Sequence, residues 1–122
     1  MILARVLLIG AALSLASCAS KPPVPNEQLA VSKAAIEQAQ RAQANEYAAV
    51  ELRQAQDKLS QAQAAVQRED YTAAKRLAEQ ADADARLAET KSHSTKARNA
   101  VAEINESIQA LRRELERRGE RK

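Results

Sequence analysis

Few side chains in this chain could carry out covalent or acid–base chemistry. The 122 residues include one cysteine, Cys18, and one histidine, His93. A hydrolase or transferase needs a nucleophile, a base and oxyanion donors that converge on one point. His93 has no second histidine to work with, and the only cysteine directly follows the apolar N-terminal run at residues 6–15 and the two small residues after it. We therefore predict that the protein is not an enzyme and that His93 is an exposed helix residue.

Acidic side chains are the other candidates, as ligands for a cation. Glu79, Asp82 and Asp84 lie close together in the sequence. Asp82 and Asp84 are two residues apart, however, and such residues point to different sides of a helix. A glycine-rich phosphate loop is excluded as well, since Gly10 and Gly119 are the only glycines in the chain. We predict a solvated acidic face, no metal, and no cofactor apart from a lipid on Cys18.

The N-terminal segment has the organisation of a signal peptide. A short basic region, Met1–Arg5, precedes ten mostly apolar residues, Val6–Leu15. A bilayer core of about 30 Å needs about 20 apolar residues, so this run is too short to be a permanent membrane helix. No other apolar run in the chain approaches its length.

The residues that end this segment resemble the lipobox of bacterial lipoproteins: Leu15, Ala16, Ser17 and Cys18. The resemblance implies cleavage before Cys18, a thioether-linked diacylglyceride on its sulfur and a further acyl chain, such as palmitate, on its new amino group. Ala19, where an aspartate would favour inner-membrane retention, indicates the periplasmic face of the outer membrane. Ser20 and Lys21 leave the inner membrane open as an alternative.

The composition after Cys18 predicts an all-α fold. Alanine occurs 24 times, against 15 leucine, isoleucine and valine residues together, and strong helix formers dominate residues 28–118. Without Arg5 the chain carries 18 basic and 16 acidic residues, and aromatic residues are only 2% of the sequence. Since the chain has no strong positive charge and only two tyrosines that could stack on bases, we predict no nucleic-acid partner.

Four regions follow from these patterns. Residues 1–17 are the signal peptide, and residues 18–26 are the lipidated cysteine with a tether that contains all three prolines. Residues 27–92 form a helical hairpin or three-helix bundle, and residues 93–122 form a C-terminal helical extension with a basic tail. Asn26 is the predicted N-cap of the first helix.

The bundle is predicted from apolar residues at helical spacing. The first helix is expected from Glu27 to about Ala44, with an interruption at Asn45. The second helix has a narrow seam of alternating large and small residues: Leu52, Ala55, Leu59, Ala62 and Val66. Asp70 is expected to cap the third helix, which has an alanine-rich face that predicts an antiparallel hairpin with the second: Ala74, Leu77, Ala78, Ala81, Ala85 and Ala88.

The C-terminal extension carries what we call the aliphatic seam, five large residues at spacings of three and four: Val101, Ile104, Ile108, Leu111 and Leu115. The weak helix formers at residues 92–95 could interrupt the helix before it. The seam covers just over two heptads, so it either folds back on the first helix or pairs with another chain. Because the first helix has few large apolar residues, we favour another chain, which makes a homo-oligomer a candidate.

Several short stretches resemble the family known as domain of unknown function 4398. They are Tyr47-Ala-Ala-Val-Glu-Leu52, Lys58-Leu59, Glu69-Asp-Tyr-Thr-Ala-Ala74 and Leu77-Ala78. The resemblance covers about residues 29–88 and implies a small helical envelope protein, often lipidated and sometimes joined to an OmpA-like domain. This chain has Gln43 and Ala49 where glycine and proline are common. The family has no established activity to transfer.

The last two residues, Arg121 and Lys122, resemble the end of the major murein lipoprotein, in which a terminal lysine is joined to peptidoglycan. Our functional prediction is a lipid-anchored envelope protein with a structural or adaptor role. It would contact peptidoglycan or an envelope protein, such as an OmpA-like one, through helix faces and the basic tail. Two alternatives are an accessory binding module for a periplasmic enzyme or transport system, and a covalent membrane-to-wall tie through Lys122.

Overall fold

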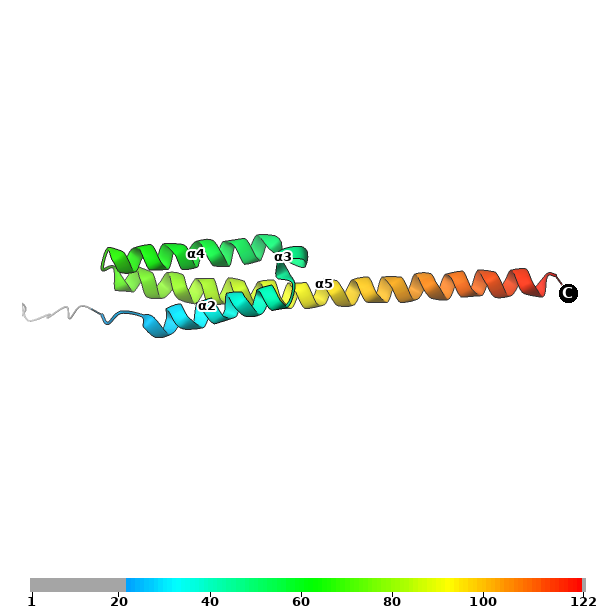
Figure 1. Ribbon diagram of the computed structural model, residues 1–122, viewed down its shortest axis with the longest axis horizontal. Helices are drawn as coiled ribbons and strands as arrows, with labels where there is room; N and C mark the ends of the chain where they lie inside the picture. Colours follow the sequence, from blue (N-terminus) through cyan, green and yellow to red (C-terminus); the bar gives the residue numbers. More distant parts are fainter. Residues whose placement is uncertain (1–21, 122) are drawn as a thin grey trace, which may run out of the picture.

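The computed structural model describes residues 22–121 and consists of three long helices and one short one. Helix α2 spans Asn26–Arg41, α3 spans Ala44–Tyr47, α4 spans Ala49–Gln67 and α5 spans Tyr71–Gly119. Helices α2 and α5 run in the same direction and α4 runs antiparallel to both (Figure 1). No strand occurs in this part of the chain. The predicted all-α fold, a helical bundle with a long C-terminal helix, is confirmed.

The core of the bundle is made mainly of alanine. Helix α5 packs against both α2 and α4. Leu77 of its predicted face is half-buried, and the five alanines of that face are buried: Ala74, Ala78, Ala81, Ala85 and Ala88. Ala55 and Ala62 of α4 are also fully buried, whereas Ile36 and Leu52 are the large aliphatic residues buried in the described chain. Small side chains let helix backbones approach closely, so each helix pair is held by many short contacts rather than by a few large side chains.

The turn between α4 and α5 closes the hairpin with a Schellman motif. The Asp70 N–H donates to the Ala65 carbonyl (2.9 Å) and the Glu69 N–H donates to the Val66 carbonyl (2.9 Å). Glu69 has φ = 59°, the left-handed conformation that this motif requires. The carboxylate of Asp70 then accepts a bond from the Ala73 N–H (3.0 Å), which confirms Asp70 as the predicted cap of the next helix.

Replacing Glu69 with glycine is expected to give a protein about 1 kcal/mol more stable than replacing it with alanine. Both variants lose the glutamate side chain, so the comparison isolates the cost of a Cβ atom at positive φ. Urea unfolding followed by circular dichroism measures the difference. An alanine variant as stable as the glycine variant would show that the left-handed conformation at Glu69 is not strained.

The break between α2 and α4 lies two residues before the predicted position. Helix α2 ends at Arg41 and the chain turns at Gln43, which has φ = 66°. Asn45, the expected interruption, instead lies inside the short helix α3. The expectation was wrong because Ala44 and Ala48 are buried in the core, and burying both requires a helical turn between them.

The N-terminal end of α2 also differs from the prediction. Asn26 is the first helical residue, and the N-cap is Pro25, with no side-chain hydrogen bond to the helix. Asn26 therefore does not cap the helix. Its backbone N–H donates to the Val24 carbonyl (2.9 Å), and the Leu29 N–H donates to the Pro25 carbonyl (3.1 Å). Pro25 itself is buried, so the end of the proline-rich tether packs on the bundle.

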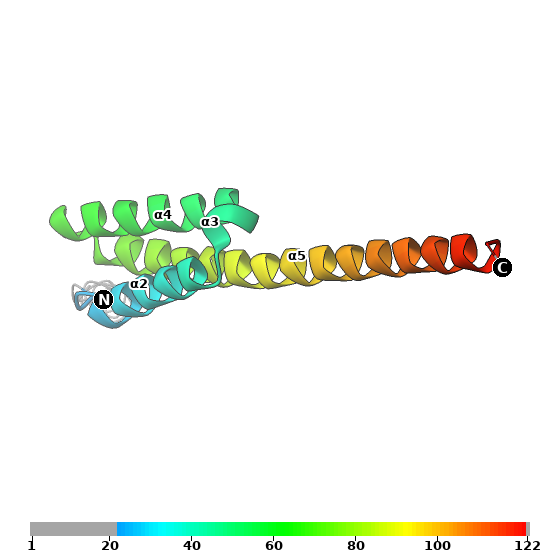
Figure 2. The same cartoon turned by 45° about the vertical axis from the view of Figure 1, so that its right-hand side comes forward.

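Helix α5 is continuous for 49 residues through the weak helix formers at residues 92–95. Ser92 is fully buried, and its hydroxyl donates to the Ala42 carbonyl at the end of α2. This small polar side chain therefore fits a close helix contact rather than marking an interruption. Beyond it the helix leaves the bundle, and both views show it projecting alone (Figures 1 and 2).

Candidate functional site

The segment that we call the α5 extension, residues 93–119, is about 40 Å of helix with few contacts to the rest of the protein. Lys96 makes the last hydrogen bond between α5 and the bundle that is seen in the described chain: its ammonium donates to the Gln43 side chain (2.6 Å). From residue 97 to residue 121 every residue is exposed except Glu114, which is half-buried. Any surface on this segment is therefore available to a partner.

All five residues of the aliphatic seam are exposed on the α5 extension. The exposed fractions are 58% for Val101, 59% for Ile104, 41% for Ile108, 65% for Leu111 and 69% for Leu115. The seam does not fold back on α2, because α2 packs on the part of α5 inside the bundle. A contiguous exposed apolar stripe of this kind is typical of an interaction site.

The seam lies on the side of α5 that faces away from the bundle. Ser92 lies at the centre of the buried face of α5, and Ile108 follows it by 16 residues, which is about 160° around an α-helix. Helices α2 and α4 therefore do not obstruct a partner that approaches the seam.

The polar side chains near the C-terminus support the helix itself. Arg118 forms an ion pair with Glu114 at 3.0 Å, and Arg117 reaches the same carboxylate at 3.5 Å. Arg121, part of the predicted peptidoglycan contact, is exposed. Exposed pairs of this type contribute a few tenths of a kcal/mol each, so they favour the helical state only modestly.

The acidic residues considered as metal ligands are each engaged with a different cation. Glu79 pairs with Lys75 at 3.9 Å, Asp82 with Arg86 at 2.9 Å and Asp84 with Lys58 at 2.5 Å: the first two pairs lie within α5, and the third joins α5 to α4. Residues 22–121 contain no group of three or more side chains that could hold a metal ion.

His93 is at the start of the α5 extension, and 62% of its side chain is exposed. Its Nε2 atom lies 3.8 Å from the Glu89 carboxylate, one helical turn earlier. This is the surface position that the sequence predicts for it.

Sequence reasoning missed an ion pair between α4 and α5 that joins residues 40 apart. The Glu51 Oε1 atom lies 2.5 Å from the Lys91 ammonium, and the Glu51 side chain is only 16% exposed. The other carboxylate oxygen, Oε2, is buried and has no hydrogen-bond partner in the described chain. The hydrogen bond from Lys91 lowers the pKa of Glu51 below its usual 4.5, against the opposing effect of burial.

The lowered pKa of Glu51 predicts an acid-sensitive bundle. The unfolded chain binds this proton more readily than the folded chain, so the contribution of Glu51 is complete above about pH 4.5 and is lost as pH falls through the lower folded-state pKa. The unfolding midpoint of the parent protein should therefore fall faster in acid than that of Glu51→Gln. Glu106→Gln, on the α5 extension, is the control and should follow the parent curve. Parallel curves for the parent and Glu51→Gln would contradict the prediction.

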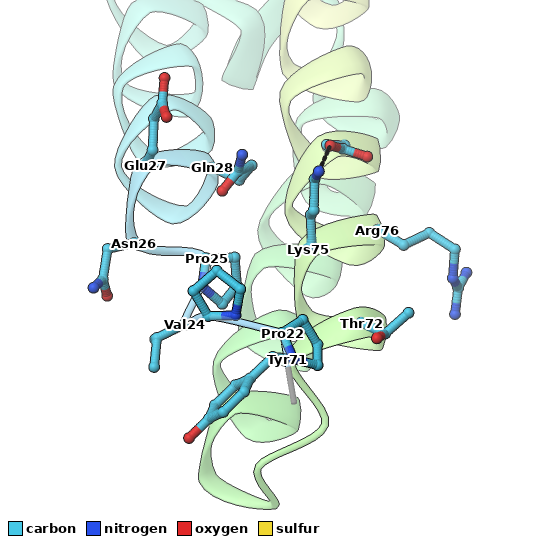
Figure 3. Close-up of a pocket in the computed structure, with 12 residues that line it drawn as sticks. Pro22, Val24, Pro25, Asn26, Glu27, Gln28, Tyr71, Thr72, Lys75 and Arg76 are labelled. Atoms are coloured by element: carbon cyan, nitrogen blue, oxygen red, sulfur yellow. Dashed lines mark ion pairs between the residues drawn. The ribbon is translucent and has the colours of Figure 1, made fainter. Parts of the chain in front are cut away.

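A second feature missed from the sequence is an open cavity of about 590 Å³ at the other end of the molecule. It lies between the proline-rich segment and the start of α5, and Pro22, Tyr71 and Arg76 are among its lining residues (Figure 3). Lys75 also lines it, and the figure shows its ion pair with the Glu79 carboxylate. The cluster of prolines was the only sequence signal for this packed end.

Three of the predicted features lie outside the described residues. They are the signal peptide, the lipobox with Cys18, and Lys122. Lipidation and wall attachment therefore remain predictions. Within residues 22–121 the structure contains no helix with the length and apolarity that a membrane span requires.

The described residues define an alanine-rich three-helix bundle in which one helix continues far beyond the other two. The chain belongs to the family described as domain of unknown function 4398, whose sequence model matches residues 27–104. This confirms the resemblance noted in the sequence. The matched range ends at Ile104, so Ile108, Leu111 and Leu115 of the aliphatic seam lie beyond it.

A solved structure supports the same assignment. The chain is similar to a protein of this family from Pseudomonas aeruginosa, whose crystal structure was determined at 2.47 Å resolution. The two are 42% identical and superpose with a TM-score of 0.68, over 76% of this chain and 96% of the Pseudomonas chain. A search of curated proteins found no match.

Proposed function

We propose that this protein is a lipid-anchored component of the bacterial envelope with a structural or adaptor role. In this proposal Cys18 holds the N-terminus at the periplasmic face of the outer membrane, and the aliphatic seam contacts a partner. The observation that carries the proposal is the exposure of all five seam residues on a helix that has left its own bundle. Contiguous exposed apolar stripes of this kind commonly mark surfaces that a partner covers.

The arrangement of the bundle supports this role. Residue 22 begins the described chain at the end of the bundle where α5 starts, and the α5 extension leaves at the opposite end (Figure 1). An anchor at Cys18 would therefore hold the bundle near the membrane, with the seam at the opposite end of α5. The bundle and the α5 extension together reach about 73 Å, the length of the 49-residue helix.

The anchor is tested by labelling cells with radioactive palmitate. The full-length chain should incorporate the label, and Cys18→Ala should not and should be lost from the membrane fraction. Stable anchoring needs two acyl signals, and Cys18→Ala removes both the thioether-linked lipid and the amide-linked acyl chain. The loss of the protein from the membrane fraction should therefore be nearly complete. Equal labelling of both proteins would contradict the lipid anchor.

The role of the seam is tested by placing a photoreactive amino acid in the full-length chain in cells. At Leu111, on the aliphatic seam, it should give one or a few defined crosslinked products after irradiation. Arg113 is the matched control, because it is two residues away and about 160° from Leu111 around the helix. Equal crosslinking from both positions, or none from Leu111, would contradict an adaptor role for the seam.

A further inference from the structure

The aliphatic seam has the spacing of a short coiled coil. Val101, Ile108 and Leu115 occupy one repeating position of the heptad, and Ile104 and Leu111 occupy the other. We propose that a second copy of this chain covers the seam and runs antiparallel to the first. Ile104 then packs on Leu115 of the second copy, and Ile108 packs on Leu111 of the second copy. This inference rests on the proposed function and identifies the partner of the same surface.

The seam is suited to pairing with itself. All its residues are large aliphatics, and a helix of the same kind supplies a complementary set at the same spacing. The bundle offers no competing cover, because α2 and α4 lie on the other side of α5. In the proposed register two kinds of layer, Ile104 on Leu115 and Ile108 on Leu111, each form twice, so four layers of large side chains lie within about 27 Å of helix at residues 101–118.

The distribution of charge along the α5 extension favours the antiparallel order. Residues 99–111 contain two acidic residues, Glu103 and Glu106, and no basic residue. Residues 112–121 contain five arginines and three glutamates, a net charge of +2. A parallel pair would place each segment beside its own copy, whereas the antiparallel pair places the acidic segment of one copy beside the basic segment of the other. Glu103 and Glu106 occupy outer heptad positions, so this preference acts at long range and not through direct contacts. The two helix dipoles also oppose each other in this order.

Arg118, just beyond the end of the aliphatic seam, also favours the antiparallel arrangement. Arg118 occupies the heptad position that follows Leu115. In a parallel pair it would meet Arg118 of the second copy, and the two like charges would repel. In the antiparallel register it lies beside Val101 of the second copy, which its aliphatic stem can cover while the guanidinium remains in water.

Leu87 is placed differently in the parallel and the antiparallel arrangement. This residue is 55% exposed and precedes Val101 by 14 residues, so it occupies the same heptad position inside the bundle. A parallel coiled coil would continue back to Leu87 of both copies. The antiparallel overlap ends near residue 101 and leaves Leu87 in solvent, with the two bundles at opposite ends of the dimer. With both Cys18 anchors in the same membrane, the paired helices therefore lie along the membrane surface.

Cysteine pairs in the full-length chain test the proposal in oxidised cells. The antiparallel register places residue 104 opposite residue 115, and two copies of residue 104 are then about 16 Å apart, too far for a disulfide. We expect a disulfide dimer from the double variant Ile104→Cys/Leu115→Cys and none from either single variant or from the parent chain. Dimers from the single variants would show a parallel pair, and no dimer from any variant would show that no second copy covers the seam. Both outcomes overturn the proposal.

Two charge substitutions in the double-cysteine chain provide the second measurement. Ile108→Glu buries a carboxylate in two layers of the dimer and should lower the disulfide-linked fraction at least about 10-fold. Leu87→Glu makes the same change outside the overlap and should leave that fraction unchanged. An equal loss from Leu87→Glu would contradict the antiparallel order. If the Leu111 photoprobe captures a different protein while the cysteine variants give no dimer, this inference fails and the proposed adaptor role stands.

Discussion

Replacing Leu52 with alanine is expected to lower the free energy of unfolding by about 2–5 kcal/mol. Leu52 is 5% exposed and packs in the core cluster with Ile36, Ala55 and Ala85. Since most of that cluster is alanine, few of its neighbours have long side chains that could move into the space. The change truncates one of the two large aliphatic side chains that are buried in the described chain, the other being Ile36. Urea unfolding of the full chain, followed by circular dichroism, measures the loss.

Leu111→Ala is the matched control for this prediction. It makes the same chemical change on the same protein, but at a position that is 65% exposed on the α5 extension. Its unfolding free energy should lie within about 0.5 kcal/mol of the parent value in monomeric protein. A similar loss from both variants would show that the core does not depend on Leu52 in the way that its burial indicates.

Enlarging the core should be almost as damaging. Ala85→Leu is expected to cost about 1–3 kcal/mol, because Ala85 is fully buried where α5 packs against the other helices and has no space for three more carbon atoms. Ala83→Leu makes the same change two residues away on an exposed position of the same helix and should leave stability nearly unchanged. A stable Ala85→Leu protein would show that the helices can separate at little cost.

The bundle was predictable because its helices are amphipathic with unusually small buried residues. The periodic alanines of α5 and the Leu52 seam of α4 identified the contacting faces, and Asp70 marked the start of α5. These signals are local and depend only on helix periodicity and capping. The short stretches that resemble the family contain the same local signals. The family resemblance and the observed helix packing therefore agree.

The break at Gln43 was not predictable from local preference. Glutamine has no tendency toward positive φ, whereas Asn45 does, so the sequence favoured the wrong residue. The turn is set by contacts between distant parts of the chain: Ala44 is fully buried, and Ser92 donates to the Ala42 carbonyl from 50 residues away. Tertiary packing therefore overrides local preference at this corner.

The candidate site was predictable in part. The heptad spacing identified the aliphatic seam by residue, and the small apolar content of the first helix indicated that the seam would not fold back on it. The Glu51–Lys91 pair and the cavity beside Pro22 could not be predicted. Each joins segments that lie 40 or more residues apart, and their contact depends on the exact register of the helix packing.

The uninterrupted course of α5 explains how a solvated helix can stay ordered. An isolated helix must first form a costly nucleus, and an exposed 27-residue segment would be only partly helical on its own. Here residues 71–92 are already helical inside the bundle, so each turn of the α5 extension adds to an existing nucleus. In the monomeric protein, amide hydrogen exchange should accordingly become faster, residue by residue, from Ser92 toward Gly119. The bundle therefore supplies the helix nucleus that keeps the aliphatic seam helical.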